Sequence, residues 1–328
     1  MSVEIYGTLG PSCADAATLA RMIGAGMTGI RLNLSHTTLR EAQPYLDAVR
    51  TAERETGRSI GLLLDMQGPE LRVGQLREPM TLREGERVAL GESGIPLPED
   101  VLRAVTKGQS ILLDDGKLRL RAESAECAVI ERGGMLRSRK SAALPGVETA
   151  LPAMTAQDRE SLALAPSCGV TAVMQPFVRG ADDLKAVRAA MDECGGAEIR
   201  LFAKIENRRG VEALAELLPH ADEIVIARGD LGNAVPLWEV PAVQKRIAAL
   251  CRESGTPFMV VTQMLASMEH ARVPTRAEMS DIFNAVLDGA ASVMVTGETA
   301  VGEYPADVIR YLTLAVRAAE TFLRENGK

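Results

Sequence analysis

Short apolar runs alternate with amphipathic stretches along most of the chain. The apolar runs are continuous, as expected for parallel strands that are covered on both faces. They predict eight strands, at residues 4–8, 29–34, 60–66, 171–177, 198–204, 223–228, 257–262 and 292–296. Amphipathic helices are predicted between and after them, at residues 15–24, 38–56, 156–165, 182–194, 208–218, 241–254, 278–288 and 305–325. Eight strands, each followed by a helix, indicate an α/β fold, a (β/α)8 TIM barrel; a doubly wound open sheet is the alternative from the pattern alone.

The regular alternation breaks once, after the third strand. Residues 75–141 contain short alternating segments punctuated by glycine, which predict a small β-rich insertion. The expected domains are therefore a barrel of residues 1–74 and 142–328 and an inserted domain of residues 75–141. An insertion in a loop that follows a barrel strand lies on the active-site face, so a lid is the functional hypothesis. A decorative or oligomerising insertion is the alternative.

Polar side chains gather where the predicted strands end. The positions are Arg31, Asn33 and Ser35 after the second strand, Asp65 after the third, Lys204 and Glu206 after the fifth, Arg228 and Asp230 after the sixth, Thr262 after the seventh, and Thr296 and Glu298 after the eighth. A single strand-end carboxylate is often only a helix cap. Six strands that change from apolar to polar at the same end indicate one shared site, because these ends converge in a barrel.

Two of these side chains are suited to a divalent metal. Glu206 and Asp230 follow neighbouring strands, and no His or Cys lies near them in the sequence. Such hard oxygen ligands favour Mg²⁺ or Mn²⁺ over zinc, and two protein carboxylates plus substrate oxygens are a usual arrangement for magnesium. Lys204 shares the strand end of Glu206, where a cation suits a phosphoryl group in transfer.

Other residues near the strand ends could hold the substrate. Arg31 and Arg72 offer forked donors for phosphate oxygens. The amide of Gly229 could hold a carboxylate. Thr262 offers a hydroxyl as a proton relay.

Composition narrows the class of protein further. Of the 328 residues 46% are apolar and 25% charged, which is sufficient for a sizeable buried core. The formal net charge of −7 argues against general nucleic-acid binding, because phosphate affinity comes mostly from Lys and Arg clusters. The five cysteines include no C-x-x-C pair, which is typical of reduced thiols. With no signal-peptide pattern and no apolar run long enough to span a membrane, we expect a soluble cytoplasmic protein.

Longer motifs resemble one known family. GTLGPSC, AGMTGIRLNLSH, LLDMQGPELRVG, ILLDDGKLRL, LPAMTAQDRESL, AKIENRRGVE, IVIARGDLG, TQMLASM, PTRAEMSDIFNAVLDG and VMVTGETAVGEYP occur in the order of the pyruvate kinase signatures. The resemblance runs from the first strand to about Pro305. It implies transfer of the phosphoryl group of phosphoenolpyruvate to ADP, giving pyruvate and ATP, with a divalent metal (Mg²⁺ or Mn²⁺) and K⁺ as cofactors.

The resemblance also assigns roles by position. Glu206 and Asp230 correspond to the divalent-metal ligands, Lys204 to the residue that stabilises the transferring phosphoryl group, Arg31 to the phosphate contact and Thr262 to the hydroxyl near the enolate carbon. Substrate binding is implied for Arg31, Gly229, Asp230 and Thr262; potassium binding for Asn33, Ser35, Asp65 and the carbonyl of Met66; and nucleotide binding or lid closure for His36, Arg72, Lys140 and Asp115.

The chain departs from the family pattern at several positions. Gln67 stands where the family has a lysine, Pro176 where it has a serine, and Ala234 where it has an acid. The predicted lid is shorter than usual, and because the chain stops after the eighth barrel helix we expect the C-terminal effector domain to be absent. A homo-oligomer remains open. A metal-dependent lyase or decarboxylase that acts on a 2-oxo acid through a pyruvate enolate, and a diverged non-catalytic metabolite-binding paralogue, are the alternative functions.

Overall fold

The computed structural model describes residues 2–114, 116–145 and 151–327. Contacts within the chain divide it into two units. The second unit comprises residues 69–152 and 229–237, and the first comprises the remainder. The boundaries at 75 and 141 that the sequence suggests for a lid remain a prediction.

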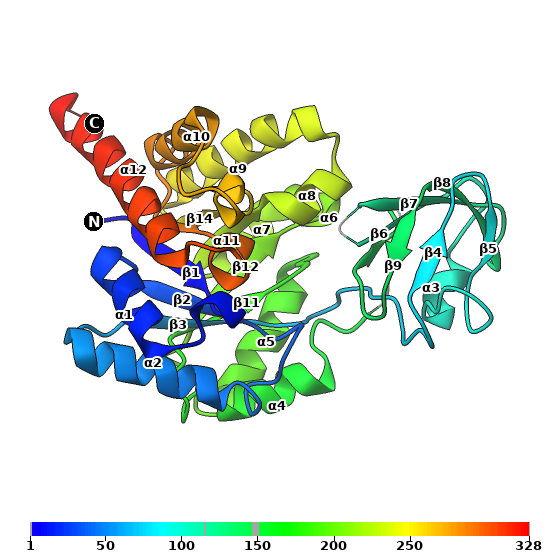
Figure 1. The fold of residues 1–328 in the computed structure, drawn as a ribbon, viewed down its shortest axis with the longest axis horizontal. Coiled ribbons are helices and arrows are strands. Elements are labelled where there is room, and N and C mark those ends of the chain that lie inside the picture. Colours follow the sequence, from blue (N-terminus) through cyan, green and yellow to red (C-terminus); the bar gives the residue numbers. More distant parts are fainter. Residues whose placement is uncertain (1, 115, 146–150, 328) are drawn as a thin grey trace. The chain divides into compact units, whose positions relative to one another are not determined.

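A closed barrel of eight parallel strands forms the centre of the first unit (Figure 1). The strands are β1 (Glu4–Thr8), β2 (Gly29–Asn33), β3 (Gly61–Asp65), β11 (Ala172–Gln175), β12 (Arg200–Ile205), β13 (Glu223–Ala227), β14 (Phe258–Val261) and β15 (Ser292–Met294). Their order around the barrel is β1-β15-β14-β13-β12-β11-β3-β2. This confirms the predicted TIM barrel and removes the open sheet as an alternative.

Large apolar side chains fill the barrel interior. Leu63 of β3 and Phe202 of β12 are fully buried in this cluster. Successive residues of a strand point to opposite faces, so the residues two positions further along each strand point inward again. These residues are Asp65 and Lys204, which is how strand periodicity places charged groups at the carboxyl end of the barrel.

Amphipathic helices surround the barrel (Figure 1). They are α1 (Ala16–Ala25), α2 (Gln43–Thr56), α4 (Ala156–Leu164), α5 (Ala181–Glu193), α6 (Arg208–Glu212), α7 (Leu214–Leu217), α9 (Val240–Ser254), α10 (Arg276–Leu287), α11 (Gly297–Ala300) and α12 (Pro305–Glu325). Short 3-10 turns are η1 (Pro11–Cys13), η2 (Leu218–His220), η3 (Leu237–Glu239) and η4 (Ala266–Glu269). The long helix α12 packs against α1 and α10.

The second helix is shorter than its sequence pattern predicts. The pattern extends from residue 38, whereas α2 begins at Gln43. Thr38 instead closes a separate turn with Glu41, whose backbone N–H donates to the Thr38 hydroxyl over 3.1 Å. Pro44 explains the break, because a proline ring clashes with the carbonyl four residues earlier unless it lies in the first helical turn.

The second unit is rich in β-structure and has its own apolar core. One sheet has the order β10-β6-β7-β8-β5 and a smaller one pairs β4 with β9. The elements are β4 (Met80–Leu82), β5 (Arg87–Ala89), α3 (Glu99–Arg103), β6 (Ser110–Leu113), β7 (Leu118–Ala122), β8 (Cys127–Arg132), β9 (Gly134–Leu136), β10 (Ala142–Ala143) and α8 (Arg228–Ala234), whose first residue belongs to the first unit. Buried and exposed residues alternate along β7, as in a sheet covered on one face.

No helix of the described residues combines the length and the apolar character that crossing a membrane requires.

Candidate active site

Four charged side chains meet at the carboxyl ends of β2, β3 and β12. Arg31 donates to Oδ2 of Asp65 from Nε over 2.8 Å and from Nη2 over 2.6 Å. The ammonium nitrogen of Lys204 lies 3.4 Å from the same oxygen and 2.8 Å from Oε1 of Glu206. The structure therefore brings together residues that the sequence places on three separate strands, with two positive and two negative charges.

Electrostatic attraction within this cluster keeps Asp65 and Lys204 charged. Burial opposes ionisation of Asp65, but the positive charges of Lys204 and Arg31 outweigh it and hold the pKa of the carboxyl below its usual range. Burial likewise opposes the charge on Lys204, but Asp65 and Glu206 raise the pKa of the ammonium group above its usual range. Lys204 is therefore a permanent cation at neutral pH.

One oxygen of Asp65 has no partner. Oδ1 is buried and makes no hydrogen bond with any residue that the structure describes. Buried polar atoms without a protein partner are uncommon, and such an atom frequently binds an ion or a water molecule. Asn33, which pairs in register with Asp65, accepts a hydrogen bond from the backbone N–H of Ser35 over 3.0 Å. Met66 is buried directly after the strand.

Glu206 is held from a second side by backbone. Its Oε2 accepts a hydrogen bond from the N–H of Phe177 over 2.9 Å, and only 2% of the residue is exposed. Phe177 has a φ of 50°, so the chain turns sharply after β11 to present this N–H. A buried carboxylate offers the hard oxygen ligands that a divalent cation such as Mg²⁺ prefers.

The other metal and substrate candidates of this strand region lie in α8. Gly229 and Asp230 belong to its first turn, two and three residues after Ala227 ends β13. They are part of the second unit. Among the described residues no group of three or more His, Cys, Asp or Glu side chains is gathered for a metal. A site built from two carboxylates and substrate oxygens does not require such a group.

Thr262 has an unusual backbone conformation. It follows β14 with a φ of 81°, and Gln263 continues with 55°. A β-branched residue in the left-handed region is a genuine outlier that costs about 1–3 kcal/mol, and such outliers cluster at functional sites. The hydroxyl of Thr262 makes no hydrogen bond with any described residue, so the protein itself leaves this group available.

Arg228 contacts the peptide of Thr262. Its Nη2 and Nε donate to the carbonyl oxygen of Thr262 over 2.8 and 3.3 Å. Nη1 of the same guanidinium donates to Oδ1 of Asp281 over 2.8 Å, and Nη2 lies 2.7 Å from Oδ2. Arg228 thus links the end of β13, the turn after β14 and helix α10.

Sequence reasoning missed three acids that organise the loops around the site. Asp158 is fully buried and accepts hydrogen bonds from the N–H groups of Gln67 and Gly68 over 2.8 and 3.0 Å. Glu278 accepts from Ser267 over 2.7 Å. Asp158 and Glu278 each complete a capping box with the threonine three residues earlier. The Thr-x-x-acid pattern at residues 155–158 and 275–278 could have predicted both boxes from the sequence. The third acid, Asp281, forms an ion pair with Arg228.

The strand-end residue Glu298 also has a structural role. It is buried, and its carboxylate accepts hydrogen bonds from Thr296 over 2.6 Å and from Leu265 over 3.1 Å. It therefore holds the turns after β14 and β15.

The residues predicted to bind nucleotide or close a lid lie in different parts of the chain. In the second unit, Arg72 donates to Oε2 of Glu70 over 2.8 Å, and Lys140 lies 2.7 Å from Oδ1 of Asp114. Their two segments pair through an isolated bridge between Arg72 and Ser141. His36, in the first unit, follows β2. Asp115 lies outside the described residues.

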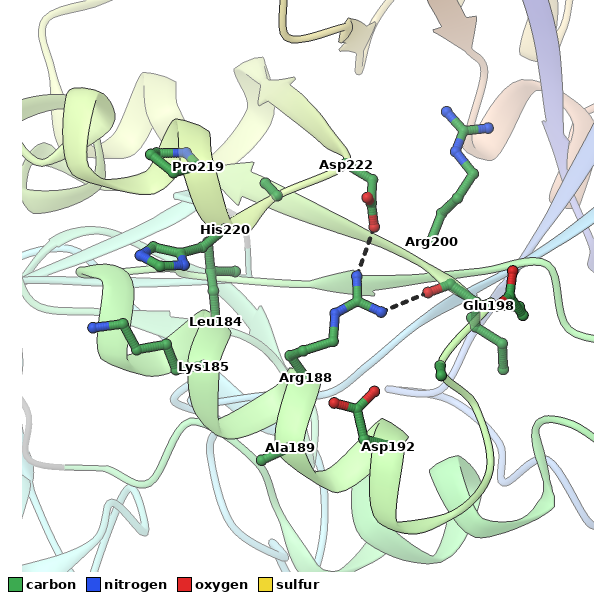
Figure 2. Close-up of a pocket in the computed structure, with 13 residues that line it drawn as sticks. Leu184, Lys185, Arg188, Ala189, Asp192, Glu198, Arg200, Pro219, His220 and Asp222 are labelled. Carbon is green, nitrogen blue, oxygen red and sulfur yellow. Dashed lines mark hydrogen bonds and ion pairs between the residues drawn. The ribbon is translucent and has the colours of Figure 1, made fainter.

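A wide hollow of about 710 Å³ lies elsewhere in the first unit. Its lining includes Arg188 of α5, Asp222 and the backbone of Ile199, at the amino ends of β12 and β13 (Figure 2). Arg188 donates to Asp222 over 2.6 Å and to the carbonyl of Ile199 over 2.9 Å. Because this is the opposite end of the strands from Lys204 and Glu206, the hollow is not part of the candidate active site.

An ionisable cluster closes the amino end of the barrel. Glu223, the first residue of β13, is fully buried. Its carboxylate bonds to the hydroxyl of Ser292 and lies 2.6 Å from Nη2 of Arg200. Burial raises the pKa of Glu223 to about 7, although Ser292 and Arg200 act against the rise. Glu4 and Tyr6 of β1 complete the cluster through a hydrogen bond of 3.0 Å.

The fold and the site define a TIM-barrel enzyme with charged groups at the carboxyl ends of its strands, where the active sites of this fold lie. A model of the family described as "Pyruvate kinase, barrel domain" matches residues 1–309. Proteins named pyruvate kinase are similar to the chain: that of Corynebacterium efficiens is 41% identical over 97% of this chain and 70% of its own length. That of Aeropyrum pernix is 37% identical over 94% of this chain and 69% of its own length.

The chain belongs to the pyruvate kinase family. It is therefore a phosphotransferase-type enzyme, and membership of the family implies a metal requirement in general terms.

Proposed function

We propose that the protein transfers the phosphoryl group of phosphoenolpyruvate to ADP and releases pyruvate and ATP. The observation that supports this most directly is the cation of Lys204, which is buried between Asp65 and Glu206 at the carboxyl end of the barrel. A lysine held in this way is oriented before substrate arrives, so its charge costs no reorganisation during the reaction.

The reaction requires charge stabilisation more than covalent participation of the protein. The bond between phosphorus and the enol oxygen breaks, its electron pair stays on that oxygen, and an oxygen of the β-phosphate of ADP forms the new bond to phosphorus. Lys204 stabilises the charge on the phosphoryl oxygens, and Arg31 contacts the phosphate. The enolate then takes a proton at its methylene carbon and becomes pyruvate. We assign Thr262 as the relay for this proton and the Gly229 amide as the group for the substrate carboxylate.

Glu206 and Asp230 would hold the divalent metal, Mg²⁺ or Mn²⁺. The buried carboxylate of Glu206 fits a hard cation. When bound, the metal supplies positive charge for the oxygens of the substrate. The ammonium group of Lys204 lies 2.8 Å from Oε1 of Glu206, so it helps to fix the orientation of that ligand.

A monovalent cation fits beside Asp65. The unpartnered Oδ1 supports this placement, because a buried anionic oxygen without a donor favours a cation. Asp65, the carbonyl of Met66, Asn33 and Ser35 would bind K⁺. Nucleotide binding by His36, Arg72 and Lys140, closure of a lid, a homo-oligomeric assembly and a cytoplasmic location remain predictions from the sequence.

A coupled assay tests the function. Pyruvate release from phosphoenolpyruvate is measured with Mg²⁺ and K⁺, in the presence and absence of ADP, together with ATP yield. We expect pyruvate and ATP in equal amounts and only when ADP is present. Proton exchange at the pyruvate methyl group without any nucleoside triphosphate from any diphosphate would overturn the proposal in favour of enolate chemistry in a lyase.

A further inference from the structure

The backbone of Thr262 is held by a side chain, whereas its hydroxyl makes no hydrogen bond with any residue that the structure describes. The carbonyl oxygen of Thr262 is the acceptor for two nitrogen atoms of Arg228, at 2.8 and 3.3 Å. A forked guanidinium that contacts one oxygen twice restrains both the position and the direction of that carbonyl.

Asp281 fixes the guanidinium in turn. The two carboxylate oxygens face Nη1 and Nη2 of Arg228 at 2.8 and 2.7 Å, a bidentate arrangement. The side chain of Arg228 is 15% exposed and that of Asp281 34% exposed. The arginine is therefore largely shielded from water and has its orientation set from two sides.

The contact with Arg228 restrains a turn whose backbone conformation is unfavourable. Thr262 and Gln263 have φ values of 81° and 55°, a pair of left-handed residues that neither side chain favours. Glu298 and Glu278 anchor the same turn further on, at the N–H groups of Leu265 and Ser267. Among the described residues, Arg228 is the only one whose side chain donates a hydrogen bond to the carbonyl oxygen of Thr262.

We propose that Arg228, oriented by Asp281, is a positioning residue for the proton step at Thr262. It keeps the peptide after Thr262 from rotating toward an extended conformation, a rotation that would turn the threonine hydroxyl away. This inference rests on the proposed function, because it assumes that Thr262 serves the protonation of the enolate.

The chain offers a matched control. Arg188 also joins a carboxylate and a backbone carbonyl, those of Asp222 and Ile199, with distances of 2.6 and 2.9 Å (Figure 2). This pair lies at the amino ends of the strands. Arg188→Gln removes the same kinds of bond as Arg228→Gln, and it leaves the turn after β14 untouched.

The experiment compares Arg228→Gln, Asp281→Asn, Arg228→Lys and Arg188→Gln in the full chain. Each is assayed for kcat and KM with phosphoenolpyruvate, for deuterium wash-in at the pyruvate methyl group with Mg²⁺, and for thermal unfolding. For Arg228→Gln and Asp281→Asn we expect kcat and wash-in to fall roughly tenfold to a hundredfold, the loss typical of a small misplacement, with KM changed little. Arg228→Lys should recover part of the loss, because an ammonium group can still donate to the carbonyl.

Two results would overturn the inference. One is that kcat falls equally in Arg188→Gln and Arg228→Gln, and in proportion to the loss of thermal stability in each. Arg228 would then have only a structural role. The other is unchanged wash-in in Arg228→Gln. Failure of the proposed function gives a different result, since the unmodified protein would then make no ATP at all.

Discussion

The ammonium nitrogen of Lys204 lies 2.8 Å from Oε1 of Glu206, two residues further along the same strand end. The residue proposed to stabilise the phosphoryl group is thus bonded to a residue proposed to hold the metal. Side chains two positions apart along a strand project to one face, which directs both groups toward the same side of this strand end. The substitution of either residue therefore changes the electrostatic surroundings of the other.

Lys204→Met should nearly eliminate ATP formation. Loss of one preorganised charge at the transition state typically costs about 3–4 kcal/mol, or roughly a hundred- to a thousandfold in rate. Metal-dependent proton exchange at the pyruvate methyl group should be less affected, because it needs no phosphoryl transfer. ATP yield and deuterium wash-in, measured on the same variant, check the difference. Equal losses in both assays would contradict a specific role in transfer.

Glu206→Gln should weaken divalent-metal binding at least about tenfold, since a neutral amide replaces a charged hard ligand. Titration of the protein with Mn²⁺, followed by its paramagnetic signal, measures the dissociation constant. Glu216→Gln, at an exposed position on α7, is the control and should leave the constant unchanged. Full Mn²⁺ affinity in Glu206→Gln would place the metal elsewhere.

Glu223 should make the barrel less stable as pH rises toward neutrality. Its pKa is about 7 in the folded protein against 4.5 for an ordinary glutamate, so the folded state retains the proton in that interval and the unfolded chain does not. The free energy of unfolding therefore falls between about pH 4.5 and 7, by a few kcal/mol in order of magnitude.

Chemical denaturation across this range measures the slope for the unmodified protein and for Glu223→Gln. Glutamine keeps the shape of the side chain but cannot ionise, so the variant should show a flatter profile. A slope of the same size in both proteins would assign the pH dependence to other groups.

Asp158→Ala should destabilise the first unit more than Glu278→Ala does. Glu278→Ala removes one side of the exposed capping box with Thr275, at about 0.5–2 kcal/mol, and the acceptor of one part-buried N–H group, that of Ser267. Asp158→Ala removes the corresponding box and leaves two N–H groups without acceptors, the part-buried one of Gln67 and the buried one of Gly68, and the buried group alone costs about 1–3 kcal/mol. Urea unfolding of the two variants compares them, and a smaller effect at Asp158 would contradict this assignment.

The barrel could be predicted from the sequence because its signals are local. Continuous apolar runs, helical spacing between them and polar residues at each strand end are readable without knowledge of the fold. Strand β1 was predicted with its observed bounds, and the apolar runs correctly placed Arg31, Asp65, Lys204 and Glu206 at the ends of strands. The start of α2 was predicted too early, at residue 38, because the helical spacing of apolar residues was followed and the helix-breaking effect of Pro44 was not.

Tertiary structure alone decided the contacts that join distant segments. Arg228 meets the carbonyl of Thr262, 34 residues away, and Asp281, 53 residues away, and no local pattern encodes either pairing. The unpartnered oxygen of Asp65 and the raised pKa of Glu223 likewise depend on burial, which only the closed barrel creates. The sequence by itself determined which side chains stand at each strand end, because strand periodicity is local. Closure of the barrel decided which of them touch, because burial and register arise only when all eight strands are in place.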